Sequence, residues 1–269
     1  MRAQFLNTNN FSTKRSLGQH FLVDQNVVRG IINSIPKITD SIFIEIGPGQ
    51  GVLTKALLNA GAPKIYVIEK DDRLIADLEQ LACQFNNRLV VIHQDALKFD
   101  YKSIGSDSIQ IVSNLPYNIG TELLISWLHQ IHMYKALTLM FQKEVADRII
   151  ASPRTKSYGR LSIISQLLCT CKKIIDIPPS AFSPAPQVYS SIVQFIPNYT
   201  AQKISLLGVI EKITAAGFGN RRKMLRQSLK GVNSNVLEWL KNSGIDEMKR
   251  AEDLTVEEYV TLAQKLSDR

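Results

Sequence analysis

The sequence has few of the features that mark secreted, membrane and metal-binding proteins. Its three cysteines, Cys83, Cys169 and Cys171, form no C-x-x-C pair, and no apolar run reaches the roughly 18 residues of a membrane span. The first 19 residues lack the apolar stretch of a secretory signal. We therefore expect free thiols, no metal site, no membrane segment and a cytoplasmic location.

The remaining composition is that of a folded globular protein. The chain has 269 residues, of which 45% are hydrophobic and 21% are charged. This is enough apolar material for one large domain or two unequal ones. With 14 glycines and 10 prolines, the chain is neither collagen-like nor of low complexity.

Positive charge is concentrated in one third of the chain. Overall, 32 Lys and Arg stand against 24 Asp and Glu, a net charge of +8. Residues 141–230 alone hold 14 bases and 4 acids, whereas residues 231–269 hold 5 bases and 8 acids. This local excess favours a face that binds a polyanion such as nucleic acid; a solvated basic surface is the alternative.

Short apolar runs alternate with amphipathic segments over most of the chain. This pattern is typical of a doubly wound, Rossmann-like α/β fold, in which helices cover both faces of a mostly parallel sheet. The expected strands are 42–46, 64–69, 89–93, 109–113, 137–141, 169–177 and 190–196, and the expected helices are 25–35, 52–59, 71–84, 121–131, 142–151 and 161–168.

The end of the pattern predicts an edge hairpin and a second domain. The strands 169–177 and 190–196 flank a Pro-rich segment, 178–186, and are expected to pair. The rest of the chain has a helical pattern without strands. We therefore expect residues 1–198 to form the α/β domain and residues 199–269 to form a small, all-helical, RNA-binding domain.

Suggestive residues follow four of the expected strands where each strand ends. They are Gly47–Gly51, Glu69, Asp95 and Asn114. The carboxyl ends of parallel strands lie at the same edge of a sheet, and ligands of doubly wound folds bind there. We therefore expect these four segments to meet at one site.

The segment Glu45–Gly51 reads Glu-Ile-Gly-Pro-Gly-Gln-Gly and leads from a strand into a helix. Its glycines permit a tight turn and a close approach to a ligand. Val52 stands where a dinucleotide fingerprint has its last glycine, which disfavours an NAD-dependent oxidoreductase, and no P-loop lysine follows. The neighbouring carboxylate suits a cationic ligand such as S-adenosylmethionine; a turn without a ligand is the alternative.

Glu69 and Asp95 stand where a nucleoside would be held. Glu69 lies 22 residues after Gly47, a position from which a carboxylate binds ribose hydroxyls in doubly wound folds. Asp95 is placed to accept a hydrogen bond from an adenine amino group. Taken singly, Glu69 could be an ordinary acid beside Lys70, and Asp95 a turn or capping residue.

The segment Asn114–Tyr117, Asn-Leu-Pro-Tyr, carries the most specific chemistry. The amino group of a base is a poor nucleophile because its lone pair is delocalised into the ring. The Asn114 side-chain oxygen and the Leu115 carbonyl can accept hydrogen bonds from that group, Pro116 stiffens the turn, and Tyr117 can stack on an unpaired or flipped base. A plain turn after a strand is the alternative for this motif alone.

These motifs and several others, in the same order, resemble the ribosomal RNA adenine N6,N6-dimethyltransferases, and among them the bacterial small-subunit type. The resemblance implies dimethylation of two adjacent adenosines in the 3′-terminal hairpin loop of 16S rRNA, within the 30S subunit, by direct transfer from S-adenosylmethionine. We expect the enzyme to act as a monomer. The segments that carry the resemblance are 14–22, 45–54, 114–117, 141–148, 158–162, 182–186 and 221–226.

Carried over by position, the resemblance assigns roles to individual residues. It places Phe182 opposite Tyr117, to stack on the target base; a core aromatic is the alternative. Gln187 and Tyr189 replace the Lys and Asp that the family often has after the second proline of its Phe-Ser-Pro-x-Pro segment. The residues placed at the S-adenosylmethionine site are His20, Leu22, Gly47, Glu69, Asp95 and Asn114.

Five cations near the end of the basic segment are expected to bind RNA. On the helix expected here, a spacing of four residues places three of them on one face, where they can meet phosphates. A solvated helical face is the alternative. The five are Arg221, Arg222, Lys223, Arg226 and Lys230.

Three other functions are compatible with the sequence. A related resistance class dimethylates an adenosine of 23S rRNA, and a DNA adenine N6-methyltransferase is a more distant possibility; activity on 30S subunits, 50S subunits and duplex DNA distinguishes them. The chain could also act mainly as a 30S assembly factor. An Asn114→Ala variant that still supported 30S maturation would indicate this last role.

Overall fold

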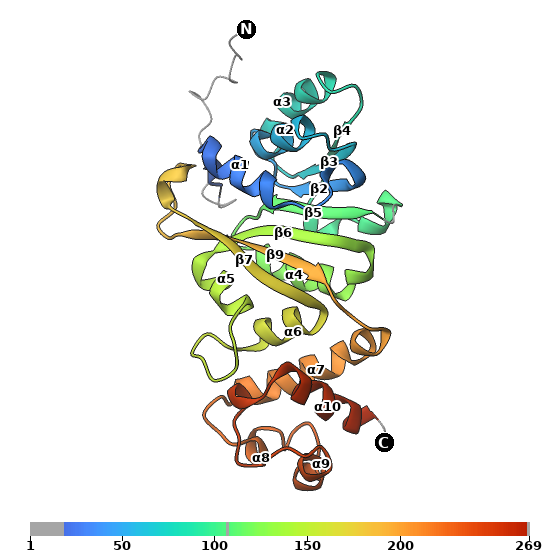
Figure 1. The fold of residues 1–269 in the computed structure, drawn as a ribbon, viewed down its shortest axis with the longest axis vertical. Coiled ribbons are helices and arrows are strands. Elements are labelled where there is room, and N and C mark those ends of the chain that lie inside the picture. Colours follow the sequence, from blue (N-terminus) through green and yellow to red (C-terminus); the bar gives the residue numbers. More distant parts are fainter. Residues whose placement is uncertain (1–18, 106–107, 268–269) are drawn as a thin grey trace.

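The computed structural model describes residues 19–105 and 108–267. Within them, a seven-stranded sheet lies between two layers of helices, and further helices follow at one end (Figure 1). The strand order is β4-β3-β2-β5-β6-β9-β7. The predicted arm and the first part of the motif 14–22 lie outside the described residues.

The parallel strands form the part of the sheet that carries the site. They are β2 (Ile42–Ile46), β3 (Lys64–Glu69), β4 (Leu89–His93), β5 (Ile109–Asn114) and β6 (Tyr134–Gln142). β5 is buried from Ile109 to Ser113, as expected for a strand with helices on both faces. β9 (Ser190–Pro197) pairs antiparallel with β6 and with the edge strand β7 (Cys169–Ile177), which confirms the predicted hairpin.

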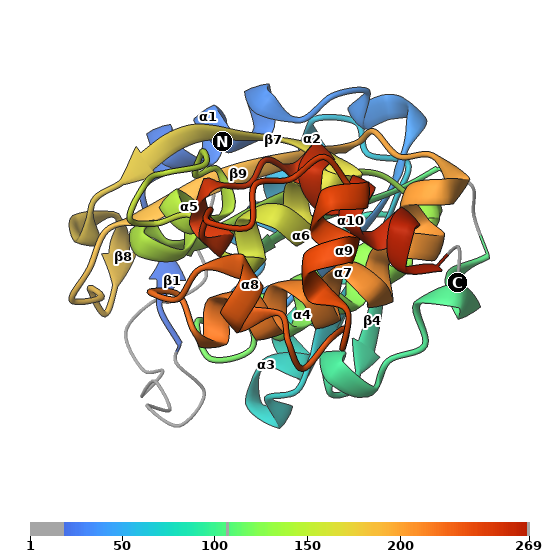
Figure 2. The same cartoon turned by 90° about the horizontal axis from the view of Figure 1, so that it is seen from below.

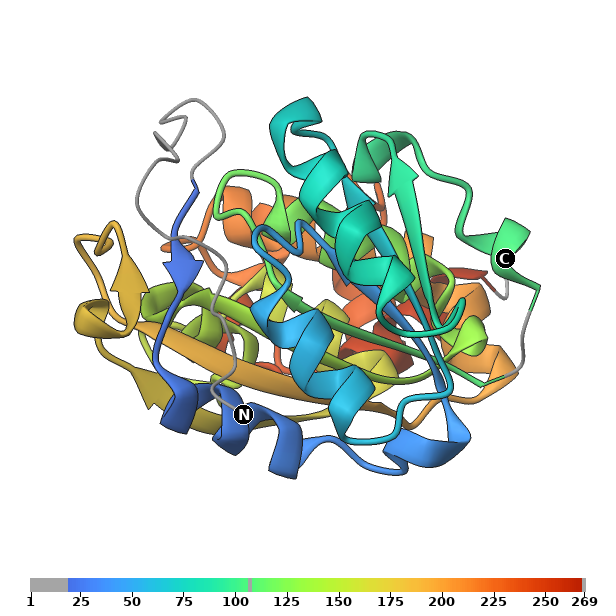
Figure 3. The same ribbon diagram turned by 90° about the horizontal axis from the view of Figure 1, so that it is seen from above.

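The helices around the sheet form two layers, each with its own apolar cluster. One cluster includes α1 (Gln25–Ser34), α2 (Val52–Asn59) and α3 (Asp72–Cys83), the layer that faces the viewer in Figure 3. The other includes α4 (Gly120–His129), α5 (Lys143–Ile149) and α6 (Arg160–Leu168). The fold is therefore a doubly wound, Rossmann-like α/β sheet, as the sequence predicts.

In the described part of the chain, four α-helices follow the sheet: α7 (Ala201–Gly219), α8 (Leu225–Ser228), α9 (Val236–Asn242) and α10 (Val256–Ser267). α7 packs against α6 and α10 (Figure 2). Buried side chains of these helices, Trp239 and Tyr259 among them, belong to the same apolar cluster as α4, α5 and α6. No helix of the described ranges is long and apolar enough to cross a membrane.

A second, two-stranded sheet was not predicted. β1 (Phe21–Leu22) pairs antiparallel with β8 (Phe182–Ser183), with Leu22 opposite Phe182. The two strands are too short to carry an alternating pattern that a sequence could reveal. Their pairing fastens the N-terminal segment to the Pro-rich connector between β7 and β9.

The predicted helix over residues 221–230 is wrong in extent, because α8 covers only Leu225–Ser228. Met224, just before it, forms a β-bridge with Arg250 and so belongs to a tertiary pairing rather than to a helical turn. The local pattern cannot reveal this partner. As a result, the cations at 222, 226 and 230 do not share one helical face.

Candidate active site

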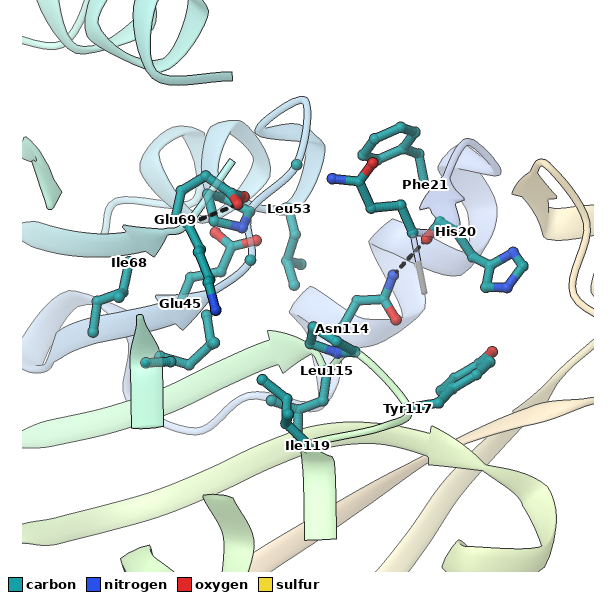
Figure 4. A pocket seen from close by; sticks show the side chains of 18 of the residues that line it. His20, Phe21, Glu45, Leu53, Ile68, Glu69, Asn114, Leu115, Tyr117 and Ile119 are labelled. Atoms are coloured by element: carbon teal, nitrogen blue, oxygen red, sulfur yellow. Dashed lines mark hydrogen bonds between the residues drawn. The ribbon is translucent and has the colours of Figure 1, made fainter. Parts of the chain in front are cut away.

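A cavity opens at the carboxyl ends of β2, β3, β4 and β5 (Figure 4). The residues that the sequence places at strand ends meet there, as the topological rule predicts. Of the predicted site residues, Phe182 and the five cations are not part of the lining formed by the described residues. Those that line it are His20, Leu22, Gly47, Glu69, Asp95, Asn114, Leu115, Pro116 and Tyr117.

The glycine-rich loop after β2 borders the cavity with its backbone. Gly47 and Gly49 have φ angles of +59° and +57°, a conformation that other residues rarely adopt. A Cβ atom on Gly49 would lie 2.7 Å from Cδ1 of Phe21, so glycine is required where β1 crosses the loop. Gly47, Pro48, Gly49 and Gln50 all line the cavity.

Glu45 adds a buried carboxyl group next to this loop, the carboxylate that the sequence predicts to suit a cationic ligand. It is 2% exposed, lines the cavity, and accepts a hydrogen bond of 2.5 Å from the Thr54 hydroxyl. Burial raises the pKa of the Glu45 carboxyl to about 8; the Thr54 hydrogen bond opposes this shift and the Glu69 carboxylate adds to it. A positively charged ligand would favour the ionised form of this group.

Glu69 ends β3 with its carboxylate fixed by the backbone that follows. Its Oε1 accepts hydrogen bonds of 2.8 Å from the N–H groups of Lys70 and Asp71. The residue is 7% exposed, and burial raises the pKa of its carboxyl above the ordinary value. A carboxylate held in this way can accept hydrogen bonds from ribose hydroxyls with little loss of conformational freedom.

The N-terminal segment 19–22 forms one wall of the cavity, and distant parts of the chain hold it. Gln19 Nε2 donates to Asp71 Oδ2 over 2.9 Å, and His20 Nδ1–H donates to the Pro184 carbonyl over 2.8 Å. Gln19 lines the cavity, although sequence reasoning did not select it. Its place in the motif 14–22 is the one feature that could have selected it. The contacts of this segment join residues more than fifty positions apart, which local sequence patterns do not predict.

Asp95 lies in the loop after β4 and has two partners. Its Oδ2 accepts a hydrogen bond of 2.8 Å from Lys70 Nζ, which lowers the pKa of the Asp95 carboxyl. Its Oδ1 accepts from the Leu97 N–H at the start of the 3-10 helix Ala96–Lys98, so the capping role left open by the sequence is real. Recognition of an adenine amino group by Asp95 stays a prediction.

Asn114 ends β5, and its carboxamide has a defined orientation (Figure 4). Nδ2 donates a hydrogen bond of 3.0 Å to the backbone carbonyl of His20. This bond uses one of the two N–H donors of the amide and sets which way the group points. The acceptor end, Oδ1, is directed toward the side of Tyr117.

Tyr117 is held on two sides. Its hydroxyl lies 2.7 Å from the Ser190 Oγ, within β9, and its ring centroid lies 5.6 Å from that of His20. Burial raises the pKa of the Tyr117 hydroxyl, so it is neutral at physiological pH. The ring therefore has a fixed place beside Asn114, from which it can contact a base.

Phe182 lies outside the cavity. It is 4% exposed in β8 and belongs to the apolar cluster of α1, α2 and α3. This is the core position that the sequence allowed as the alternative. To stack on a base, the ring would have to leave this packing, and that role stays a prediction.

The five predicted RNA-binding cations fall into two groups. Arg221 Nε lies 2.5 Å from Glu252 Oε2, and Arg226 Nη1 lies 3.1 Å from Glu247 Oε1, so these two are in ion pairs. The other three, Arg222, Lys223 and Lys230, are exposed and have no ion pair with any described residue.

Two further expectations concern thiols and metals. Cys83, Cys169 and Cys171 are free. Across residues 19–105 and 108–267, no group of three or more His, Cys, Asp or Glu side chains is arranged to hold a metal ion.

The sequence matches the family described as "Ribosomal RNA adenine dimethylase" over residues 10–268. It is 43% identical, over 258 residues, to "Ribosomal RNA small subunit methyltransferase A" of Chelativorans sp. (strain BNC1), covering 94% of this chain and 93% of that protein. It is 44% identical, over 251 residues, to the protein of the same name from Gluconobacter oxydans (strain 621H), covering 93% of this chain and 82% of that protein.

Solved structures agree with this result. The crystal structure of a dimethyladenosine transferase from Plasmodium falciparum superposes with a TM-score of 0.79 and 25% identity, covering 93% of this chain and 98% of that one. The 23S rRNA methyltransferase ErmE superposes with a TM-score of 0.69 and 22% identity, covering 92% and 99%, a likeness of fold alone. With a family match over nearly its whole length, the chain belongs to the ribosomal RNA adenine dimethylase family.

Proposed function

We propose that this protein transfers methyl groups from S-adenosylmethionine to N6 of adenosines in small-subunit ribosomal RNA. The observation that carries the proposal is the orientation of the Asn114 carboxamide, whose donor end is bound to the His20 carbonyl and whose acceptor end is directed toward the side of Tyr117. The family and the names of the relatives support the same reaction and the same class of substrate.

The acceptors of the loop after β5 suit an exocyclic amino group. Asn114 Oδ1 and the Leu115 carbonyl would accept its N–H bonds, which favours a more tetrahedral and more nucleophilic nitrogen. Pro116 has no N–H and a fixed φ, so it adds no competing donor and keeps the turn rigid. The chain thus acts by positioning and by polarising the amine, without a covalent enzyme intermediate.

The charges of the cavity fit S-adenosylmethionine, which supplies an electrophilic methyl group when bound. The cavity lining includes the carboxyl groups of Glu45, Glu69 and Asp95, and the one lysine of that lining, Lys70, is paired with Asp95. Glu69 would hold the ribose hydroxyls and Asp95 the adenine amino group. His20, Leu22 and Gly47 would enclose the rest of the molecule.

At the finer level, the proposed target is a pair of adjacent adenosines in the 3′-terminal hairpin loop of 16S rRNA, methylated within the 30S subunit late in its assembly. A base reaches such a cavity only when it is unpaired or flipped, and a hairpin loop supplies unpaired bases. The second transfer requires the monomethylated amine to return with one N–H, which one of the two acceptors can still hold.

The organisation that follows from this target has two parts. Residues 1–198 would carry out methyl transfer, and residues 199–269 would add RNA contacts, including those of Arg222, Lys223 and Lys230. A monomer is sufficient, because all the proposed groups come from one chain. Ribosome assembly implies a cytoplasmic location.

The test is methyl transfer from labelled S-adenosylmethionine to undermethylated 30S subunits, with 50S subunits and duplex DNA in parallel. We expect label on 30S subunits alone, recovered as N6,N6-dimethyladenosine. Label on 50S subunits would move the target to 23S rRNA and leave the chemistry standing. No label on any of them, with intact cofactor binding, would contradict the proposal and favour a role in assembly alone.

A further inference from the structure

The connection between α5 and α6 lies within the basic segment 141–230. Residues 148–175 include no acidic residue, and the loop 152–160, called the pinned loop below, carries Arg154, Lys156 and Arg160. All three side chains are exposed. None of them is among the RNA-binding residues predicted from the sequence.

The pinned loop is attached to the C-terminal part of the chain. The Tyr158 ring is fully buried, and its hydroxyl donates a hydrogen bond of 2.9 Å to the Leu254 carbonyl. The Arg154 N–H donates to the Glu252 carbonyl over 2.8 Å. Although the loop is polar and exposed, its backbone is therefore held in one place.

Arg221 connects the pinned loop to the turn 221–223. Its Nη2 donates to the Thr155 carbonyl over 3.2 Å, and its Nε donates to the Glu252 carboxylate over 2.5 Å. The same residue is followed in sequence by Arg222 and Lys223. The two exposed cations of the turn therefore directly follow a residue that contacts the loop.

Four of these cations have no counter-charge. Lys156, Arg160, Arg222 and Lys223 form no ion pair with any residue that the structure describes. Arg160 is also the first residue of α6, where the helix dipole disfavours a positive charge. Exposed cations without a counter-ion are available to contact the phosphates of a polyanion.

The pinned loop is linked to the carboxyl end of β6 through α5. α5 begins directly after β6, and Gln142, the last residue of β6, borders a small hollow with Tyr117. The seven residues of α5 then span about 10 Å to the pinned loop. In Figure 1 the loop, the end of β6 and the connector at β7 lie on the same side of the molecule.

We propose that the pinned loop and the turn 221–223 form one phosphate-binding surface, which holds the ribosomal RNA strand beside the adenosine in the cavity. Lys156, Arg160, Arg222 and Lys223 contact phosphates, and the Arg221–Glu252 pair positions them. The proposal rests on the proposed function for its RNA substrate. It assigns RNA contacts to individual residues of the α/β part, whereas the five RNA-binding residues predicted by name all lie in the C-terminal part.

The first test compares two double variants of the full chain. Lys156→Gln with Arg160→Gln removes two proposed contacts. Lys102→Gln with Lys135→Gln removes two exposed lysines outside the proposed surface, one in the 3-10 helix Tyr101–Ile104 and one at the start of β6. Affinity for an RNA hairpin with two adjacent loop adenosines is measured at several salt concentrations. Cofactor affinity and melting temperature are measured on the same samples.

The loop variant is expected to bind the hairpin about tenfold more weakly, with a salt slope smaller by about 1.4–1.8, since each phosphate contact contributes about 0.7–0.9. The control variant should match the wild type, and cofactor affinity should be unchanged in both. Equal affinity and slope in the two variants would overturn the proposal. If the two variants differ in RNA affinity in this way but the wild-type protein transfers no methyl group, the proposed function is overturned and the surface is still supported.

The second test concerns the positioning role. Glu252→Gln removes a negative charge and keeps every cation, so charge alone predicts tighter RNA binding. Loss of the Arg221 pairing predicts weaker binding, which we expect to be about two- to fivefold. Tighter binding by this variant would overturn the positioning role of the pair.

Discussion

The charged side chains of the cavity and those of the basic surface near the C-terminus differ in their burial and in the groups that fix them. The basic surface comprises Arg221, Arg222, Lys223, Arg226 and Lys230. In the cavity, two of the three carboxyl groups are buried: Glu45 is 2% exposed and Glu69 is 7% exposed, whereas Asp95 is half-buried. Glu69 is fixed by backbone N–H groups. On the basic surface the cations are exposed or half-buried, and the fixed ones, Arg221 and Arg226, are fixed by acidic side chains.

This difference matches two kinds of ligand. A buried, fixed carboxylate suits a small cationic molecule bound in a single geometry, with little dependence on salt because buried charges are weakly screened. Exposed cations suit a long polyanion bound through many weak contacts, whose affinity falls steeply with salt. Cofactor binding should therefore depend on pH and RNA binding on salt.

The largest expected effect is on the cavity side. Glu69→Ala removes the carboxylate that would hold both ribose hydroxyls, and charge-assisted hydrogen bonds contribute about 1.5–3 kcal/mol each. We expect S-adenosylmethionine affinity, measured by calorimetry, to fall about a hundredfold or more. Glu79→Ala, an exposed acid on α3, is the control and should bind as the wild type does. Equal binding by both variants would contradict the role of Glu69.

Tyr117 lines the cavity, where the base is proposed to enter. Its loss should slow methyl transfer to RNA and leave cofactor binding unchanged. Tyr117→Ala removes a proposed stacking partner of the base, and such stacking contributes about 1–3 kcal/mol. The kcat/KM of methyl transfer to 30S subunits should fall about five- to 150-fold, with cofactor affinity retained. Tyr117→Phe keeps the ring and loses only the Ser190 contact, so it should keep most of the activity. Equal activity of the alanine variant and the wild type would exclude stacking.

Glu45 provides a test of charge through pH. Its pKa in the folded, ligand-free protein is raised to about 8, so it binds a proton that it loses on unfolding at neutral pH. Its contribution to the free energy of unfolding must therefore decline as pH rises from about 5 to about 8, with a slope of at most about 1.4 kcal/mol per pH unit. Glu45→Gln should lack this slope. Denaturant unfolding at several pH values measures it, and parallel curves for the two proteins would refute the shift.

The smallest expected effects separate the two groups of cations. Arg226→Gln breaks an exposed ion pair with Glu247 and should lower the free energy of unfolding by at most about 1 kcal/mol. Arg222→Gln breaks no ion pair and should leave stability unchanged while it lowers the salt slope of RNA binding by about 0.7–0.9. Thermal unfolding measures stability, and salt titrations of RNA binding measure the slope. Lower stability of Arg222→Gln, or a smaller salt slope for Arg226→Gln alone, would contradict the separation of paired from unpaired cations.

The cavity and the cations also differ in how well the sequence predicts them, because only the cation prediction depends on exact element boundaries. The site at the strand ends was predictable because the rule depends on strand order and not on exact boundaries: Asn114 is the last residue of β5 even though the expected strand stopped one residue earlier. The helical-face argument for 222, 226 and 230 required a helix of exact extent, and the bridge between Met224 and Arg250 prevents one.

Contacts between distant segments account for most of the remainder. The pairing of Leu22 with Phe182 and the hydrogen bond from Asn114 to the His20 carbonyl join segments 94 or more positions apart. No local periodicity encodes such partners. They decide that Phe182 is buried and that the Asn114 amide has one orientation.

The most direct test of the central claim is the Asn114→Ala variant, assayed on the same samples for S-adenosylmethionine binding and for methyl transfer to undermethylated 30S subunits. If the oriented acceptor polarises the adenine amine, transfer should fall at least about a hundredfold. Cofactor affinity should change only a few fold. Transfer that persists near the wild-type rate would contradict the account, because the acceptor that defines this site would then have no part in the reaction.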